Sequence, residues 1–313
     1  MLSFSEKLTV AVKSKNNPTV MGLDPKLEYI PANLLQKWRA ELVDDEQFIE
    51  EALVRFNSAL IDAVHDIIPA VKPQAAYYEM YGLPGLKALA RTIALAKAKN
   101  MLVILDGKRN DIGSTASAYA AAWLGQTKLG EIDRAFWDAD ALTVNAYLGI
   151  DGIQPFIDVA EKYGKGIFVL VRTSNPSAAD FQDLELTDGR KVYEAVAETL
   201  TKWSKNYLGS DGYSPIGAVV GATWPEQAVK MRQVLQHSWI LVPGYGAQGG
   251  TAADCAKQFK ADGTGAIVNA SRSLMCAYKK QTEFPAEEFA KATRQEALRM
   301  RDDLIKAIGE RDT

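Results

Sequence analysis

The sequence is poor in cysteine and histidine, with two of each among its 313 residues. Cys255 and Cys276 lack the spacing of a metal site, so a reduced, cytoplasmic setting is the simplest expectation. His65 falls within a helical pattern and His237 just before a strand, and both are far from any Cys-x-x-Cys or His-x-x-x-His partner. We therefore expect neither a zinc centre nor a Ser-His-Asp triad.

The sequence also lacks a long apolar run and a strong charge of one sign. No apolar stretch approaches the ~20 residues that cross a bilayer, and the N-terminal residues lack the apolar region of a signal peptide. We therefore expect no membrane partner. The net charge of −3 gives no electrostatic reason to expect a nucleic acid. The 47% of hydrophobic and 24% of charged residues are typical of a globular protein with a large core.

Eight short apolar runs are present, and helical patterns separate them. The runs cover residues 19–23, 70–72, 102–105, 141–144, 167–171, 216–220, 240–242 and 266–268. Apolar residues recur at helical spacing over residues 46–68, 86–99, 151–163, 225–236 and 286–308. Buried strands that alternate with helices indicate βαβ units and a parallel sheet. Eight such strands without a break in composition predict a (β/α)₈ TIM barrel, with residues 1–313 forming a single domain.

Two of the segments between strands are long, residues 24–69 and residues 172–215. We expect them to carry insertions near residues 25–50 and 175–212, which would account for the excess over the about 250 residues of a plain barrel. The second segment is rich in turn signals and follows a strand end. It could therefore form a lid over the barrel mouth.

Polar residues stand at the carboxyl end of nearly every predicted strand, where barrel enzymes keep their active sites. The densest group, Asp106, Lys108 and Asp111, follows the third strand. An extended strand would point Asp106 and Lys108 to one face, and such charges are costly to bury unless they are paired or used. An isolated D-x-K-x-x-D match often marks only a salt-bridged surface turn. A functional site is indicated by the polar residues at the other strand ends, which are Asp24, Lys72, Asn145, Thr173, Ser174, Asn175, Asn269, Ser271 and Arg272.

The glycine-rich residues 244–249 match G-x-G-x-x-G between a strand and a helix. A dinucleotide-binding unit would require an acidic residue at the end of the next strand, but Asn269 stands there and no further strand follows. In a barrel, the loops after strands seven and eight often form a phosphate site, to which Gln248 and Arg272 would add donors. A plain glycine-rich turn is the remaining alternative. We expect a phosphorylated substrate.

With these residues assembled, the chain resembles the orotidine 5′-monophosphate decarboxylase family, in its longer bacterial-type branch. The likeness is carried by LDGKRNDIGST at residues 105–115, and it extends from residues 22–25 to residues 269–272. The resemblance implies decarboxylation of orotidine 5′-monophosphate to UMP, in pyrimidine biosynthesis, without a metal or an organic cofactor. It assigns the catalytic charge network to Lys72, Asp106, Lys108 and Asp111.

Within that network, the resemblance implies that Lys108 donates the proton. The substrate contacts that it implies involve Asp24, Ile112, Thr115, Ser174, Gln248 and Arg272. Asp24 would hold a ribose hydroxyl, Ser174 the pyrimidine, and Gln248 and Arg272 the phosphate. Thr173 could serve in place of Ser174, and Asn145 matches no definite role.

The resemblance further implies a homodimer with shared active sites, in which Asp111, Ile112 and Thr115 act in the site of the other subunit. Two alternatives stay open. Sugar-phosphate β-decarboxylases, such as 3-keto-L-gulonate 6-phosphate decarboxylase, share the D-x-K-x-x-D pattern but use Mg²⁺. A phosphate-ligand sensor on an inactive barrel is the other, although such a protein would have no use for the costly charges at Lys72, Asp106, Lys108 and Asp111.

Overall fold

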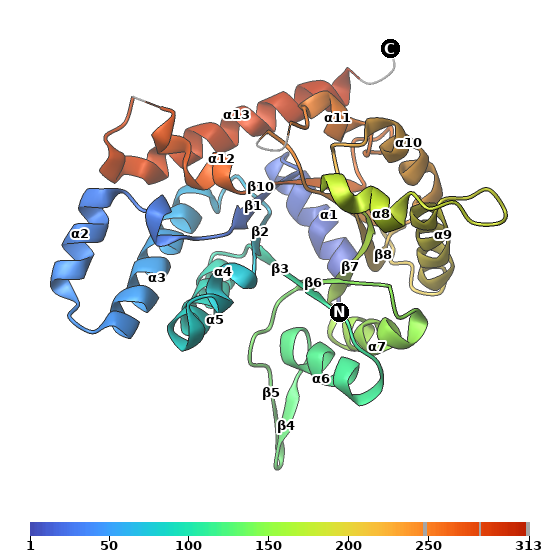
Figure 1. The fold of residues 1–313 in the computed structure, drawn as a ribbon, viewed down its shortest axis with the longest axis horizontal. Coiled ribbons are helices and arrows are strands. Elements are labelled where there is room, and N and C mark those ends of the chain that lie inside the picture. Colours follow the sequence, from blue (N-terminus) through green and yellow to red (C-terminus); the bar gives the residue numbers. More distant parts are fainter. Residues whose placement is uncertain (247–248, 282, 311–313) are drawn as a thin grey trace.

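The eight apolar runs form a closed barrel of parallel strands (Figure 1). The computed structural model describes residues 1–246, 249–281 and 283–310. The order of the strands around the barrel is β1-β10-β9-β8-β7-β6-β3-β2. Their bounds are β1 (Thr19–Leu23), β2 (Ala70–Pro73), β3 (Leu102–Arg109), β6 (Ala141–Val144), β7 (Gly166–Arg172), β8 (Ser214–Val220), β9 (Ser238–Val242) and β10 (Ala266–Ala270). The predicted TIM barrel and its eight strands are confirmed.

Helices surround the barrel and connect its strands (Figure 1). The five predicted helical stretches correspond to α3 (Asp45–Val64), α5 (Gly82–Ala98), α7 (Gln154–Tyr163), α10 (Pro225–Val234) and α13 (Phe289–Gly309). The other helices are α1 (Phe4–Lys15), α2 (Ala32–Glu41), α4 (Ala76–Glu79), α6 (Gly113–Trp123), α8 (Ala179–Gln182), α9 (Val192–Ser204), α11 (Ala252–Ala256) and α12 (Arg272–Met275). Single 3-10 turns lie at η1 (Leu27–Tyr29), η2 (Ile150–Gly152), η3 (Pro176–Ala178), η4 (Ala277–Lys279) and η5 (Ala286–Glu288). No helix in these described ranges is long and apolar enough to cross a membrane.

Helix α1 closes the base of the barrel, passing behind the strands in Figure 1. Its buried residues Phe4, Leu8 and Val12 belong to the same apolar cluster as the inward-facing side chains of the strands. The Phe4 ring meets the Phe168 ring edge to face, with 5.8 Å between centroids. The sequence analysis did not predict α1, because three apolar residues four apart among lysines and serines make a narrow stripe.

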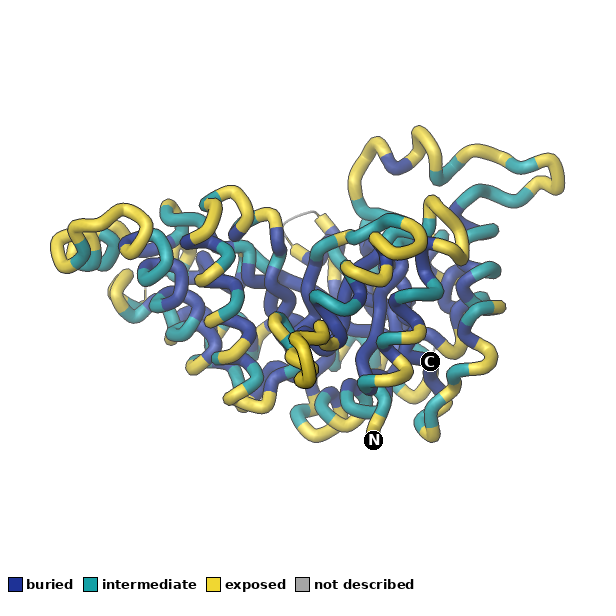
Figure 2. The backbone as a smooth tube through the Cα atoms, turned by 90° about the horizontal axis from the view of Figure 1, so that it is seen from below, coloured by how far each residue is buried: buried dark blue, intermediate teal, exposed yellow. Residues whose placement is uncertain are grey.

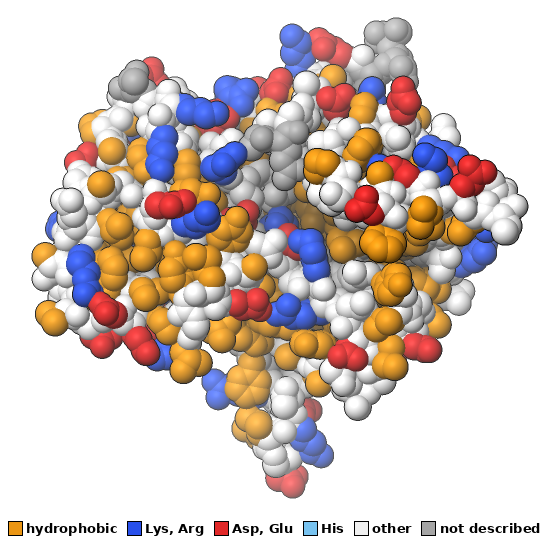
Figure 3. All heavy atoms as spheres, in the orientation of Figure 1, with side chains coloured by type: hydrophobic (Ala, Val, Ile, Leu, Met, Phe, Trp, Pro, Cys, Tyr) orange, Lys and Arg blue, Asp and Glu red, His pale blue; other side chains and the backbone are white. Residues whose placement is uncertain are grey.

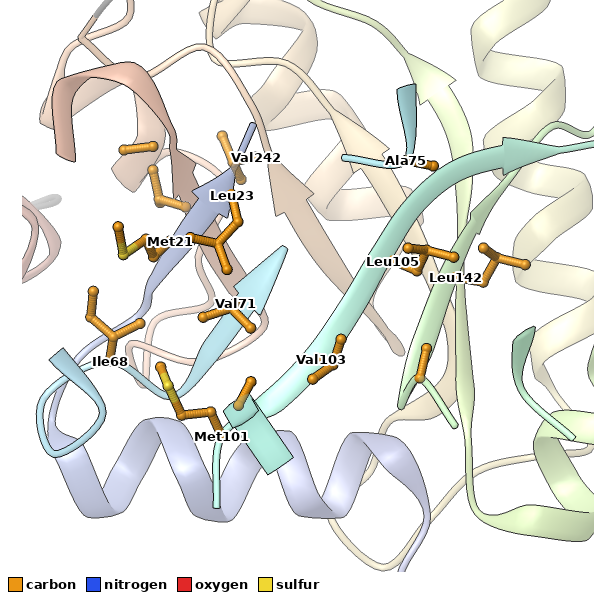
Figure 4. Close-up of a cluster of buried hydrophobic side chains, with 14 of the residues drawn as sticks. Met21, Leu23, Ile68, Val71, Ala75, Met101, Val103, Leu105, Leu142 and Val242 are labelled. Atoms are coloured by element: carbon orange, nitrogen blue, oxygen red, sulfur yellow. The ribbon is translucent and has the colours of Figure 1, made fainter. Parts of the chain in front are cut away.

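A second apolar layer fills the space between the strands and the helices. Outward-facing residues such as Met21, Val71 and Leu105 are fully buried there and point away from the barrel interior (Figure 4). Figure 2 shows the buried backbone concentrated in the middle of the molecule, with exposed loops around it. Complete burial of a side chain of this size contributes about 1.5–3 kcal/mol, so this layer fixes the strands that carry the site.

The two long segments are built differently from the prediction. In the first, the extra element is α2, and α3 then packs as a regular barrel helix. In the second, the irregular part is shorter than expected, because α9 packs against β7 and β8 as the helix of that βα unit. The extra residues, 173–191, contain η3 and α8 and rise above the barrel at the upper right of Figure 2.

A hairpin that the sequence analysis did not predict projects from the barrel after α6. It consists of β4 (Thr127–Leu129) and β5 (Ile132–Arg134), and it points downward in Figure 1. All six strand residues are exposed. Because neither face is buried, the hairpin leaves no alternation of buried and exposed residues in the sequence that could predict it.

Candidate active site

The polar layer of the barrel lies directly above the apolar layer that α1 closes. Along each barrel strand, every second residue points inward. In β2 and β3, the lower inward positions are Ala70 and Ile104, which belong to the apolar interior. Two residues further on stand Lys72 and Asp106, and the same step in β6 leads to Thr143. The alternation of the strands therefore brings these polar side chains together at the barrel mouth.

A cleft of about 670 Å³ opens above this layer. Figure 3 shows the centre of this face hollowed, with Lys and Arg side chains in the hollow. Polar side chains from most of the strand ends line the cleft: Asp24, Lys72, Gln74, Asp106, Lys108, Thr143, Thr173, Ser174, Asn269, Ser271 and Arg272.

Asp106 is the centre of the charge network. The Nζ atoms of Lys72 and Lys108 each lie 2.6 Å from one of its carboxylate oxygens. Gln74 Nε2 donates to Oδ2 at 2.9 Å, and Thr143 Oγ1 donates to Oδ1 at 2.8 Å. Burial alone would raise the pKa of Asp106, but the two ammonium groups outweigh it and hold that pKa well below its usual value. Asp106 is therefore ionised at neutral pH.

The two lysines differ in access. The Lys72 side chain is 6% exposed, whereas that of Lys108 is 47% exposed. Burial would lower the pKa of Lys72, but the carboxylates of Asp106 and Asp24 raise it above its usual value. Lys72 is thus a fixed cation beneath the cleft, and Lys108 is the ammonium that a ligand can reach.

Lys108 has an unusual backbone conformation for a residue other than glycine in a strand. Its φ is +45°, and the pairing of β3 with β6 shifts register between Leu105 and Arg109. The Lys108 N–H donates to Thr143 Oγ1 at 2.9 Å. The prediction that Asp106 and Lys108 share a face is correct in outcome, but the strand bends at Lys108 and is not extended through it.

Asp24 and Ser174 lie in the cleft as predicted. The buried Oδ1 of Asp24 accepts no hydrogen bond from the described part of the chain, and burial raises the pKa of its carboxyl although Lys72 opposes this. The Thr173 hydroxyl is 2.7 Å from Asn175 Oδ1 and accepts from Gln182 Nε2 at 2.8 Å. Ser174 Oγ makes no such contact with the described residues, so of the two neighbours Ser174 has the free hydroxyl.

The structure describes only some of the residues that we expect to bind the phosphate. Arg272 is exposed, begins α12 and borders the cleft. Gly244 and Tyr245 of the glycine-rich loop line the same cleft. Gln248 lies outside the described residues.

Asp111, Ile112 and Thr115 do not line the cleft of their own chain. They stand where β3 gives way to α6, with Asp111 half-buried and the other two exposed. The Asp111 carboxylate accepts a hydrogen bond from the Ile112 N–H at 2.8 Å. Asn145 also makes a hydrogen bond to a neighbouring residue, because its Oδ1 accepts from the Tyr147 N–H at 2.9 Å.

Gln74 and Thr143 are the site residues that the sequence analysis missed. Each had a signal: Gln74 stands two residues beyond Lys72 and therefore on the same strand face, and Thr143 is the polar residue within a four-residue buried strand. Both complete the hydrogen bonds of Asp106. Among the described residues, no group of three His, Cys, Asp or Glu side chains is arranged to hold a metal ion.

Comparison with known proteins agrees with this geometry. Residues 22–286 match the model of the orotidine 5′-phosphate decarboxylase / HUMPS family. The chain is 46% identical over 281 residues to orotidine 5′-phosphate decarboxylase of Rhodopirellula baltica, covering 90% of this chain and 91% of that one. It is 43% identical over 279 residues to the enzyme of the same name from Caldicellulosiruptor saccharolyticus, covering 89% and 91%.

Among solved structures, the chain is similar to a putative orotidine 5′-phosphate decarboxylase from Streptomyces avermitilis. The TM-score is 0.77 at 31% sequence identity, and the match covers 99% of this chain and 97% of that one. The sequence relatives and the family model extend over nearly the whole barrel, including the strands that carry Lys72, Asp106 and Lys108. The chain therefore belongs to the orotidine 5′-phosphate decarboxylase / HUMPS family.

Proposed function

We propose that this protein decarboxylates orotidine 5′-monophosphate to UMP, in pyrimidine biosynthesis, without a cofactor. The observation that carries the proposal is the ionised Asp106 between two ammonium groups, of which Lys108 reaches into a cleft of nucleotide size. The curated relatives with 38–46% identity are named for this activity.

The chemistry places a specific demand on Lys108. When the bond between C6 and the carboxylate breaks, the electron pair stays on C6, and no adjacent carbonyl can delocalise it. Lys108 would stabilise this developing charge and then give its proton to C6, regaining one from solvent. Asp106 would lie near the departing carboxylate and hold Lys108 in place, with Lys72 balancing its charge.

The remaining residues would bind the nucleotide. Asp24 has an unpartnered buried oxygen for a ribose hydroxyl, and Ser174 has a free hydroxyl for the pyrimidine. Arg272 would hold the phosphate together with Gln248. Phosphate binding far from C6 can supply the energy that organises the charge network.

One assay tests the activity. Purified protein should remove the absorbance of orotidine 5′-monophosphate at an unchanged rate after EDTA treatment. Loss of activity on EDTA treatment that Mg²⁺ restores would favour the metal-dependent sugar-phosphate decarboxylases of the same family. Binding of the nucleotide with no turnover in either condition would favour a sensor.

We further propose that the chain is a single domain and works as a homodimer with shared active sites. Asp111, Ile112 and Thr115 would then complete the cleft of the partner subunit. Two observations support this: these residues do not line the cleft of their own chain, and exposed apolar side chains lie in the neighbouring segments. They are Ile112, Leu129, Ile132, Phe136, Tyr147, Leu148 and Ile150, and Figure 3 shows hydrophobic side chains on the hairpin and beside it.

A mixed dimer tests the shared site. We expect Lys72→Ala and Asp111→Ala each to be inactive alone. If Asp111 acts in the partner's site, one site of the co-purified mixed dimer collects both changes and the other is intact, so about half of normal activity returns. If Asp111 acts in its own site, each site keeps one change, and the mixed dimer stays inactive.

A further inference from the structure

A fully buried arginine stands at the end of β7, next to the pyrimidine-binding segment proposed above. Arg172 has 0% exposure. Its NH2 group lies 3.0 Å from Asp183 Oδ2, and its NH1 group donates to Gln182 Oε1 at 3.2 Å. The guanidinium carbon lies 4.2 Å from the centre of the Trp224 ring. A buried charge with ion-pair, hydrogen-bond and aromatic partners is held in one position.

The partners of Arg172 also hold Thr173. Gln182 Oε1 accepts from the Thr173 N–H at 2.9 Å, and Gln182 Nε2 donates to the Thr173 hydroxyl at 2.8 Å. Trp224 Nε1 donates to the Thr173 carbonyl at 3.0 Å. The N–H, the carbonyl and the hydroxyl of Thr173 are thus all engaged, and the conformation of the chain at Thr173 is fixed.

The fixed conformation at Thr173 also positions Ser174, the next residue. Its carbonyl accepts from Thr223 Oγ1 at 3.2 Å. A Cβ on Gly221 would lie 2.8 Å from the Ser174 Cα, so the Ser174 backbone packs closely against a position that has room only for glycine. The Ser174 side chain borders the cleft.

We propose that Arg172 and Gln182 are positioning residues that hold Ser174 where its hydroxyl meets the pyrimidine of the nucleotide. The inference rests on the proposed function and adds the residues that set the geometry of its pyrimidine contact. Arg172 is buried beside the cleft without lining it, whereas Gln182 borders the cleft as well as Thr173.

The first test is Gln182→Ala in the full-length protein. We expect the affinity for UMP to fall about tenfold, while the affinity for ribose 5-phosphate, which lacks the pyrimidine, stays unchanged. Titration calorimetry with both ligands measures this. An equal loss for the two ligands would show a general structural role and would overturn the inference.

A double-mutant cycle gives a second test. If Gln182 acts through Ser174, Gln182→Ala should weaken UMP binding less than about twofold in a Ser174→Ala background. Additive losses would contradict the inference. The outcome differs from failure of the proposed function, because that failure would appear as wild-type protein without decarboxylase activity.

Two further variants guard against a folding artefact. Gln182→Glu keeps an acceptor for the Thr173 N–H and for Arg172, so we expect most of the UMP affinity to be retained. Arg190→Ala is the matched control, because Arg190 lies in the same segment but bonds to Asp188 and Glu198. It should leave both affinities unchanged, and if it mimics Gln182→Ala the inference is wrong.

Discussion

The barrel carries two clusters of lysine and aspartate, one at each end. At the mouth, Lys72 and Lys108 flank Asp106. At the base, the second cluster comprises Lys97, Asp138, Asp140 and Lys165. Asp138 lies 2.6 Å from the Nζ of Lys165 and 2.8 Å from that of Lys97, and Asp140 is within 3.7 Å of both.

The two clusters use similar charges for different purposes. At the base, Lys97 also donates to the Asp138 carbonyl at 2.9 Å, and Asp140 accepts from the Val103 N–H at 2.9 Å. These bonds tie a helix end to the start of a strand, and the base cluster lies outside the lining of the cleft. At the mouth, Lys108 is half exposed in the cleft. Both clusters contain ion pairs, but only in the mouth cluster can a ligand in the cleft reach one of the cations. This access distinguishes the candidate active site from the base cluster.

The strongest test of this distinction compares Lys108→Ala with Lys165→Ala. Lys108→Ala should lower kcat by at least about 10³-fold, because it removes the proposed proton donor, while UMP still binds. Lys165→Ala should leave kcat within about twofold, since that ammonium never meets substrate. Steady-state assays and UMP titration of both variants make the comparison. Near-normal turnover of Lys108→Ala would show that Lys108 is not the proton donor.

Arg272→Ala tests whether a cation without an ion-pair partner binds the substrate, in contrast to the paired cations of the base cluster. Arg272 makes no ion pair within the described residues, whereas every cation of the base cluster is paired. Its loss should lower kcat/KM for orotidine 5′-monophosphate by about 10²-fold, mostly through KM. Orotidine without a phosphate should react equally poorly with wild type and variant. If the variant still prefers the phosphorylated substrate as strongly as wild type, the phosphate binds elsewhere.

At the base, the expected effect is on stability. Lys165→Ala should lower the free energy of unfolding by about 2 kcal/mol, because two carboxylates lose a buried charged donor. Lys37→Ala, at an exposed position on α2, is the control and should change it by less than about 0.5 kcal/mol. Urea denaturation measures both. A Lys165 variant as stable as the control would show that the base cluster does not hold the barrel together.

The smallest expected effect is the pH dependence of the base cluster. Burial would raise the pKa of Asp138, but Lys165 and Lys97 lower it below its usual value of 3.8. A lowered pKa means that the carboxylate stabilises the fold above pH 3.8 and that this contribution disappears as the pH falls through the pKa of the folded state. Asp138→Asn should therefore be less stable than wild type by about 0.5–1 kcal/mol at pH 7, with a smaller difference below pH 3.8. A difference that does not change with pH would contradict this.

The same comparison shows what the sequence could predict. The mouth cluster was found because Lys72, Asp106 and Lys108 interrupt apolar runs at strand ends. The base cluster was not found, because Lys97 belongs to a helix and Asp138 and Lys165 lie outside the apolar runs. Their meeting depends on the pairing of β3 with β6 and of β6 with β7, which places separate segments side by side and leaves no periodic signal in any of them.

Three local features were not predicted, each for its own reason. The hairpin β4–β5 buries neither face, and α9 stands in a segment whose turn signals suggested an insertion throughout. Gln182 could not be recognised as a partner of Arg172 and Thr173, because a glutamine in a segment that was predicted to be an insertion is ordinarily a solvated residue. Only the folded arrangement shows that its amide joins the end of β7 to α8.

The positive φ of Lys108 has a consequence for how this protein evolves. A left-handed backbone at a residue with a side chain is about 1–2 kcal/mol less favourable than at glycine. Lys108→Gly should therefore be more stable than Lys108→Ala, reversing the usual order of the two residues, although both lack the ammonium. Folding and the proposed catalytic role of Lys108 then select in opposite directions at this one position. Relatives that lose the activity should drift from lysine towards glycine or asparagine here, becoming easier to fold as they lose the enzyme.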